Sequence, residues 1–312
     1  MSNIQMVLNV SLLRAAIRCS TPILLAALGA VFTQQANILN IGMEGMMLLG
    51  AFTAVAVSFT TQSAFLGLLA AICVGILLAL VIAVVSLKFK ADMTLAGIAI
   101  NLLGTWVSRL LLKNLFHQVG SFYSPDIVPL PTVNIAFLDK LPLIGEIINR
   151  FSILDYVAIL LVLITYYAIF RTPWGLRVRA VGIHSLAAET TGINVPVIQY
   201  TVLIISGALS GMAGAHLGLG YTTMFSEGMS GGRGFMGVAA MFFGGAMPVK
   251  AWFAAILFGF CDALAARLQV FGLPPQFPLM LPYVATVAVL AVSMAQAGRP
   301  RPRKEVSTES GS

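Results

Sequence analysis

The sequence predicts an all-α fold, a polytopic bundle of about 8–10 transmembrane helices that includes broken or re-entrant segments. Composition is the first reason: 59% of the 312 residues are hydrophobic and only 9% are charged, whereas a soluble domain carries about a quarter charged residues. The second reason is that the apolar runs are about twenty residues long and unbroken, which suits helices in hydrocarbon and not the alternating strands of a membrane β-barrel.

Apolar stretches of membrane-spanning length follow one another along the chain. They are 10–32, 41–60, 63–87, 92–113, 151–171, 198–220 and 277–297, and the glycine-rich region 235–268 is predicted to hold two more, divided near Pro248 and Lys250. We expect a single transmembrane domain, 1–298, followed by a basic, disordered cytoplasmic tail, 299–312.

The net charge of +7 comes from basic residues in the loops, which is the pattern that orients a membrane protein and is not a nucleic-acid surface. Lys88 and Lys90 mark one loop, residues 171–197 hold a second group, and the tail carries a third. Placing all three in the cytoplasm makes the crossings alternate from residue 87 onward. The segment 114–150 is then expected outside the cell.

The first three apolar segments leave two topologies open. Arg14 and Arg18 favour a cytoplasmic N-terminus, but three full crossings before Lys88 require an external one. Either the stretch 33–45, within "TQQANILNIGMEGMMLLG", is a broken or re-entrant element, or it is an ordinary interfacial loop and the N-terminus is external.

The same stretch is rich in amides and carries one acid. Asn37, Asn40 and Glu44 are three and four residues apart, so a helix would place them on one face, and Gln34 precedes them. Such groups can replace the water hydrogen bonds of a neutral, hydroxyl- or base-bearing solute. They can equally cap broken helix ends. Asn101, in the middle of segment 92–113, either joins helices or lines the solute path.

Other chemistry is sparse in the sequence. The three cysteines (Cys19, Cys73 and Cys261) lie in apolar segments without metal-ligand spacing, so no metal site is predicted. The acids near membrane depth, Glu44, Asp92 and Asp262, are few for a carrier driven by an ion gradient. His216 is expected to be a packed or hydrogen-bonded helix residue. A packing face of small residues is predicted at Gly207, Gly211, Gly214 and Gly218.

The cytoplasmic loop 171–197 is too patterned for a plain turn. Within it, "SLAAETTGI" is predicted to form a short helix with Ser185 as its N-cap and Gly192 as its stop. The small side chains of Ala187 and Ala188 would let this helix seat in a groove of a cytoplasmic partner.

Three stretches together resemble a known family. They are "NILNIGMEGMMLLGAF" (37–52), "GLRVRAVGIHSLAAETTGINV" (175–195) and "SGGRGFMGVAAMFFGGAMP" (230–248), the last continuing to "FGFCDALAARLQ" (258–269). The sequence resembles the permease subunits of bacterial ATP-binding-cassette (ABC) importers for simple sugars and nucleosides, which are related to ribose and branched-chain amino-acid permeases. The last stretch looks closest to permeases paired with a lipoprotein that binds purine nucleosides.

The resemblance implies a type II ABC importer-like subunit in the bacterial inner (plasma) membrane. This chain would have no cofactor of its own, with ATP and Mg bound by cytoplasmic ATPase subunits. A second permease subunit, identical or different, and an extracytoplasmic binding lipoprotein would complete the complex. Loop 171–197 would be the coupling loop, with Gly182, Ala187, Ala188 and Gly192 matching the family pattern and Arg177 and Arg179 beside them. Many relatives have Glu-Asn-Pro where this chain has Ile183, His184 and Ser185.

The expected function is therefore transport without catalysis: the translocation subunit of an ATP-driven importer for nucleosides, or otherwise for simple sugars. A branched-chain amino-acid ABC permease and a self-contained, ion-coupled secondary transporter are the alternatives.

Overall fold

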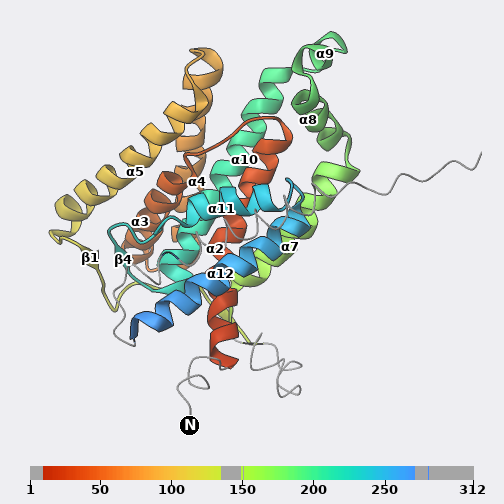
Figure 1. Cartoon of the computed structure of the whole chain (residues 1–312). Helices are drawn as coiled ribbons and strands as arrows, with labels where there is room; N and C mark the ends of the chain where they lie inside the picture. Colours follow the sequence, from red (N-terminus) through yellow and green to blue (C-terminus); the bar gives the residue numbers. More distant parts are fainter. Residues whose placement is uncertain (1–9, 135–148, 150, 271–279, 281–312) are drawn as a thin grey trace, which may run out of the picture.

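The structure is a computed structural model that describes residues 10–134, 149, 151–270 and 280 (Figure 1). Helices account for nearly all of its regular structure. They are α2 (Val10–Gln35), α3 (Met43–Thr61), α4 (Ala64–Ala83) with the π-turn η1 (Val84–Lys88), α5 (Met93–Phe116), α7 (Ile153–Arg171), α8 (Pro173–Ile183), α9 (Ser185–Thr190), α10 (Val195–Ala215) with the π-turn η3 (His216–Tyr221), α11 (Arg233–Phe243) and α12 (Pro248–Val270).

Seven of the described helical segments are long and apolar enough to cross a membrane. The strands are two residues each: β1 (Ser121–Phe122) pairs antiparallel with β4 (Phe225–Ser226), and β2 (Thr132–Val133) with β3 (Phe151–Ser152). The predicted all-α membrane bundle is confirmed. The expected span 277–297 and the tail 299–312 lie outside the described residues.

Helices α2 and α10 form the centre of the bundle. Burial covers 83% and 78% of their most apolar windows, against 33% for α4, α5 and α7. Figure 1 shows α3, α4 and α5 on one side of this pair and α7 on the other. The outer helices expose large apolar side chains such as Phe65, Leu77 and Leu163. Such apolar surface is typical of helices that face lipid or a neighbouring subunit within a membrane.

Glycine permits the close approach of α10 to its neighbours. A Cβ on Gly207 would overlap the carbonyl oxygen of Gly75 on α4, and one on Gly211 would overlap that of Ala71. Gly214 faces the carbonyl of Met47 on α3 in the same way, and a Cβ on Gly218 would lie 2.8 Å from a Val55 methyl group. Backbone therefore packs directly on backbone, as small residues allow in membranes.

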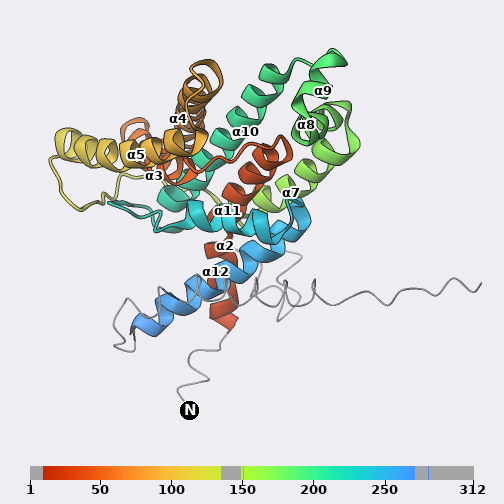
Figure 2. The same cartoon turned by 45° about the horizontal axis from the view of Figure 1, so that its top comes forward.

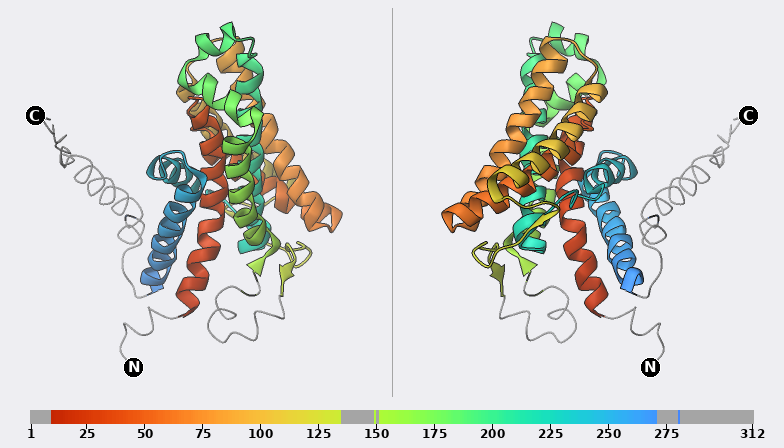
Figure 3. Two further views of the ribbon diagram at one scale, coloured as in Figure 1. Left: turned by 90° about the vertical axis from the view of Figure 1, so that its right-hand side faces the viewer. Right: turned by 90° about the vertical axis from the view of Figure 1, so that its left-hand side faces the viewer.

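The start of α2 lies at the opposite end of the molecule from α8 and α9 (Figure 3). An N-terminus on the same side as loop 171–197, as Arg14 and Arg18 favoured, is therefore wrong, and α2 runs the full distance as one helix. Both arginines are engaged within the protein: they donate to the carbonyls of Asn149 and Gly220 and lie over the rings of Phe151 and Tyr221. Guanidinium groups held in this way do not report which side faces the cytoplasm.

The sequence predicted two full spans in region 235–268, and this prediction is wrong. α11 has 11 residues, about 16 Å of helix, which is too short for a hydrocarbon core of about 30 Å. It is a half-helix that lies across α2 in Figures 1 and 2. The chain then turns at 244–247, where Gly245 and Ala246 have positive φ, and returns as α12.

Candidate functional site

The link 36–42 between α2 and α3 is non-helical and lies beside α8. Asn37 has a left-handed backbone (φ 56°) and an exposed side chain. Together with Ala36 it lines a cleft of about 280 Å³ whose other wall is formed by residues 181–186 and Gln199. Gln34 is half-buried at the end of α2. Gln34 and Asn37, two of the amides predicted to line the solute path, therefore lie close to the α8–α9 end of the molecule.

Asn40 and Asn101 hold the link in place through their side-chain amides. Asn40 is buried, donates to Ser206 Oγ on α10 (3.0 Å) and accepts from the backbone N–H of Gly42 (3.0 Å). Asn101 on α5 donates to the carbonyl of Ile41 (3.0 Å) and accepts from the N–H of Gly45 (2.8 Å). These amides replace the hydrogen bonds that a continuous helix would supply.

Glu44 joins α3 to the half-helix α11. Its Oε1 accepts from the N–H of Gly232 and its Oε2 from the N–H of Gly234, both at 2.8 Å. A carboxylate is stabilised at a helix N-terminus by the free N–H groups and by the helix dipole. The approach requires glycine at 234, because a Cβ there would lie 2.7 Å from the Glu44 backbone. We call this contact the Glu44 joint.

Helices α8 and α9 form a compact unit at one end of the molecule. Thr172 caps α8 through the N–H of Gly175 (3.1 Å), and Gly182 packs against the carbonyl of Gln35 at the end of α2. The cap of α9 is His184, whose Nδ1 accepts from the N–H of Ala187 (3.1 Å). The prediction of Ser185 as N-cap is wrong by one residue, because His184 is the last residue with extended backbone.

The exposed face of this unit differs from the predicted one. Ala188 is 5% exposed and belongs to the main hydrophobic core, so it does not face a partner. Ile183 and Leu186 are 86% and 68% exposed, and Ala187 is exposed beside them. We call Ile183, Leu186 and Ala187 the α8–α9 surface.

The remaining residues predicted for coupling lie on α8 or just after α9. Gly192 ends the helical turn with φ +84°. Arg177 is exposed and lines a second cleft with residues 191–194. Arg179 is half-buried, with its guanidinium 5.3 Å from the centre of the Phe170 ring.

A buried polar cluster escaped the sequence reasoning. Asp155 on α7 accepts at Oδ1 from Thr21 Oγ1 on α2 (2.6 Å) and pairs there with Nε2 of His216 on η3 (2.9 Å). The side chains of Asp155 and His216 are both at most 2% exposed. Asp155 stands three residues into its helix, where an acid looks like an interfacial residue, and the sequence alone does not mark it as a membrane acid. His216 is hydrogen-bonded, as expected.

Comparison with known proteins identifies the family. Residues 12–290 match the family described as branched-chain amino acid transport system / permease component. The chain belongs to this permease family.

Individual relatives match along most of their length. The guanosine ABC transporter permease protein NupQ of Bacillus subtilis (strain 168) is 34% identical to the permease, over 90% of this chain and 91% of its own. The nucleoside ABC transporter permease protein NupC of Lactococcus lactis subsp. cremoris (strain MG1363) is 33% identical over 90% and 92%. The putative glucose ABC transporter permease protein TsgC13 of Haloferax volcanii is 32% identical over 91% of each. No solved structure matches.

The permease is thus a multi-pass protein of the plasma membrane and the transport component of a larger system. The ion-coupled alternative is not favoured, and the three acids that the sequence placed near membrane depth offer it little. Glu44 caps α11, Asp92 caps α5, and Asp262 pairs with Arg233 at 2.7 Å. Carboxylates engaged in this way have little capacity left to bind a coupling ion.

Arg109 of the permease pairs with Glu227 (2.6 Å) in the loop before α11. Glu227 also accepts from the N–H of Gly120 (3.0 Å). The Gly120 N–H and then Arg109 hold the pKa of Glu227 below its usual value. The folded form therefore gains stability from this carboxylate above its ordinary pKa, and loses that gain as the pH falls through the lowered value.

We expect acid to release this loop. Amide hydrogen exchange of residues 117–122 is to be compared between the native permease and Glu227→Gln at each pH. Because the intrinsic exchange rate at a given pH is the same for both chains, the difference reports protection alone. The native chain should be better protected at pH 7, and the two should converge as the pH falls through the lowered pKa of Glu227. Equal protection of both chains at pH 7 would contradict this assignment.

Proposed function

We propose that this permease forms the membrane path of an ATP-driven importer for nucleosides. The observation that carries the proposal is the similarity to a guanosine and a nucleoside ABC transporter permease over about nine-tenths of both chains. Simple sugars are the second candidate, because a putative glucose permease is similar over an equal length.

The α8–α9 surface is proposed to dock a cytoplasmic ATPase subunit, which binds the ATP and Mg. Exposed apolar side chains on a short rigid helix unit are typical of the centre of a protein interface. A second permease subunit and an extracytoplasmic binding protein complete the proposed importer. Because α8–α9 and the start of α2 lie at opposite ends (Figure 3), the binding protein would approach the α2 end.

A continuous set of contacts leads from α8–α9 to the half-helix. Gly182 packs on the carbonyl of Gln35, and the side chain of Gln35 donates to the carbonyl of Ala246 in the α11–α12 turn (2.9 Å). The Glu44 joint then holds the other end of α11 to α3. We propose that ATP-driven movement of α8–α9 reaches α11 as a rigid-body shift through these contacts.

The substrate is tested with the complete complex, purified with its partner subunits and reconstituted in liposomes. Uptake of labelled guanosine, driven by ATP, is measured against excess adenosine, uridine, ribose, glucose or leucine. We expect the nucleosides to compete and the other solutes to leave uptake unchanged. Uptake of glucose or leucine without uptake of any nucleoside would overturn the assignment.

The docking surface is tested with Leu186→Asp. A charge in the centre of an apolar interface is left unpaired and desolvated, so we expect co-purification of the ATPase to fall at least about tenfold. Val119→Asp is the matched control. It places the same charge at a position that is 78% exposed and that follows the C-terminal end of α5. If Leu186→Asp retained the ATPase as well as Val119→Asp does, α8–α9 would not be the docking surface.

A further inference from the structure

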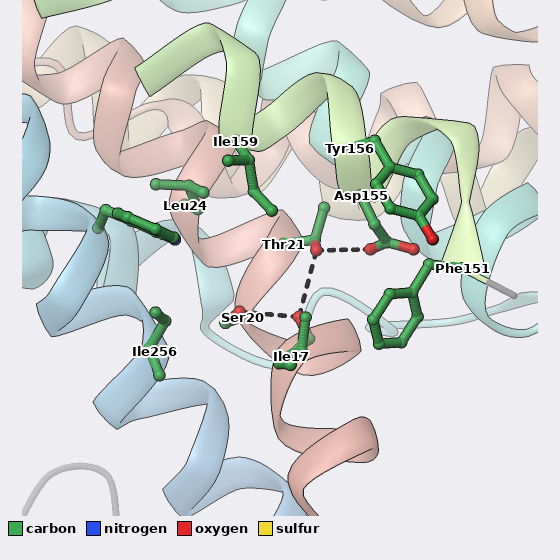
Figure 4. Close-up of a pocket in the computed structure, with 10 residues that line it drawn as sticks. Ile17, Ser20, Thr21, Leu24, Phe151, Asp155, Tyr156, Ile159 and Ile256 are labelled. Atoms are coloured by element: carbon green, nitrogen blue, oxygen red, sulfur yellow. Dashed lines mark hydrogen bonds between the residues drawn. The ribbon is translucent and has the colours of Figure 1, made fainter. Parts of the chain in front are cut away.

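A cavity of about 260 Å³ lies between α2, α7 and α12 (Figure 4). Its walls are mostly aliphatic, and three aromatic side chains line it: Phe151, Tyr156 and Trp252. Its polar lining consists of Ser20, Thr21 and Asp155, with the hydroxyl of Ser20 donating to the carbonyl of Ile17 on its own helix (2.7 Å). Apolar walls with a few placed polar groups are the usual make-up of a small-molecule site.

The two oxygens of the Asp155 carboxylate differ in their hydrogen-bond partners. Thr21 and His216 both contact Oδ1, whereas Oδ2 is buried and has no hydrogen-bond partner among the described residues. Figure 4 shows Thr21 and Asp155 facing each other across the α2–α7 contact, with Phe151 and Tyr156 beside the carboxylate. A buried carboxylate oxygen needs a donor. Because Asp155 lines the cavity, Oδ2 is the oxygen of this side chain that is left to accept a hydrogen bond from a ligand there.

The two contacts to Oδ1 keep the carboxylate in one orientation. His216 is 0% exposed, and its Nε2 lies 2.9 Å from Oδ1 of Asp155. Thr21 donates from the other helix. Thr21 and His216 are positioning residues, and Asp155 is the group that would contact a ligand.

We propose that this cavity is a binding subsite for the base of the transported nucleoside, with Asp155 Oδ2 accepting a hydrogen bond from a ring N–H. The inference rests on the proposed nucleoside import. The bases hypoxanthine, guanine and uracil supply two features that fit the cavity: flat faces that can stack on aromatic side chains and an N–H donor in the ring plane. Adenine and cytosine have the flat faces but no ring N–H in their nucleosides, so adenosine should bind here more weakly than inosine. A sugar ring also combines an apolar face with donors, so the probes below separate a base from a sugar.

Inosine and its N1-methyl derivative are the matched probes, because the methyl group removes the ring N–H and leaves the rest of the molecule unchanged. Uptake of each is measured in the reconstituted complete complex. We expect the methylated probe to show a KM about tenfold higher than inosine does, since a site built around a hydrogen bond rejects the analogue that lacks the donor. Glucose should not compete with either.

Asp155→Asn tests the carboxylate directly. Its amide can turn its NH₂ group toward the cavity, where it no longer accepts a hydrogen bond. The KM of the methylated probe should then exceed that of inosine by less than about twofold. Trp252→Leu tests the wall without touching the Asp155–His216 contact: the KM for both probes should rise while their ratio is kept. Tyr167→Phe is the control, because this side chain is 64% exposed on the same helix as Asp155, and it should leave both KM values unchanged.

Each outcome decides between the proposals. If the native complex imports inosine and the methylated probe equally well, or if Asp155→Asn keeps the native preference, the subsite is overturned and nucleoside import stands. If Asp155→Asn fails to fold, Trp252→Leu decides, and an unchanged KM for inosine overturns the subsite. If the native complex imports no nucleoside, the proposed function itself fails.

Discussion

Replacing Gly75 by leucine is expected to prevent the bundle from assembling. Gly75 on α4 faces the carbonyl of Gly207 on α10, and a Cβ there would also lie 3.0 Å from Gly211 Cα. The obstacle is backbone, which cannot rotate away as a side chain can, so α4 and α10 must separate. Overpacking typically costs about 1–3 kcal/mol and occasionally more, and a backbone obstacle places this site at the upper end, a large part of the stability of a typical domain.

The matched control is Leu77→Ala, two residues along the same helix. The Leu77 side chain is 58% exposed on the outside of the bundle. We expect Leu77→Ala to give native yield and native thermal stability in detergent. Gly75→Leu should give little folded protein, as judged by size-exclusion fluorescence after heating. A Gly75→Leu chain that extracts and melts like the native protein would show that α4 and α10 do not pack as described.

Replacing Glu44 by alanine is expected to abolish transport and to lower thermal stability. The change removes two charge-assisted hydrogen bonds and leaves the N–H groups of Gly232 and Gly234 without an acceptor. Hydrogen bonds to charged groups contribute about 1.5–3 kcal/mol each, so we expect a loss of about 3 kcal/mol or more. Because α11 would no longer be held to α3, uptake should fall together with stability.

The same position decides between the two roles left open for this carboxylate. If Glu44 holds the half-helix, Glu44→Gln, with one acceptor oxygen, should be intermediate in both stability and uptake. If Glu44 contacts solute instead, the KM or solute preference should change while thermal stability stays native. Thr53→Ala is the control on the same helix, since its hydroxyl donates only to carbonyls of its own preceding turn.

The amide cluster illustrates what sequence reasoning could and could not reach. Their polarity within an apolar chain marked Asn40 and Glu44 as important. The shared helical face that their spacing predicted does not form, because Asn40 lies in the non-helical link before α3. Their partners, however, lie far along the chain: Ser206 for Asn40, and Gly232 and Gly234 for Glu44. Nothing local in the sequence selects these partners, because the pairing depends on how α3, α10 and α11 pack.

The α8–α9 unit shows the same limit on a smaller scale. Gly192 predicted where helical structure would stop, since φ preferences act locally. Whether Ala188 or Leu186 faces outward depends on how α9 is rotated against the bundle. The core contact of Ala188 sets that rotation, and six helical residues have too weak a periodicity to reveal it.

By itself, the sequence determined that this chain is a helical membrane protein and placed most of its spans, because lipid requires long apolar helices that satisfy their own backbone groups. It also carried the family resemblance. Only the tertiary structure decided that α11 is a half-helix held by Glu44, that Arg14 and Arg18 are engaged inside the protein, and that Asp155 and His216 meet across 61 residues. Hydropathy acts residue by residue along the chain, whereas these polar contacts exist only once distant helices have packed.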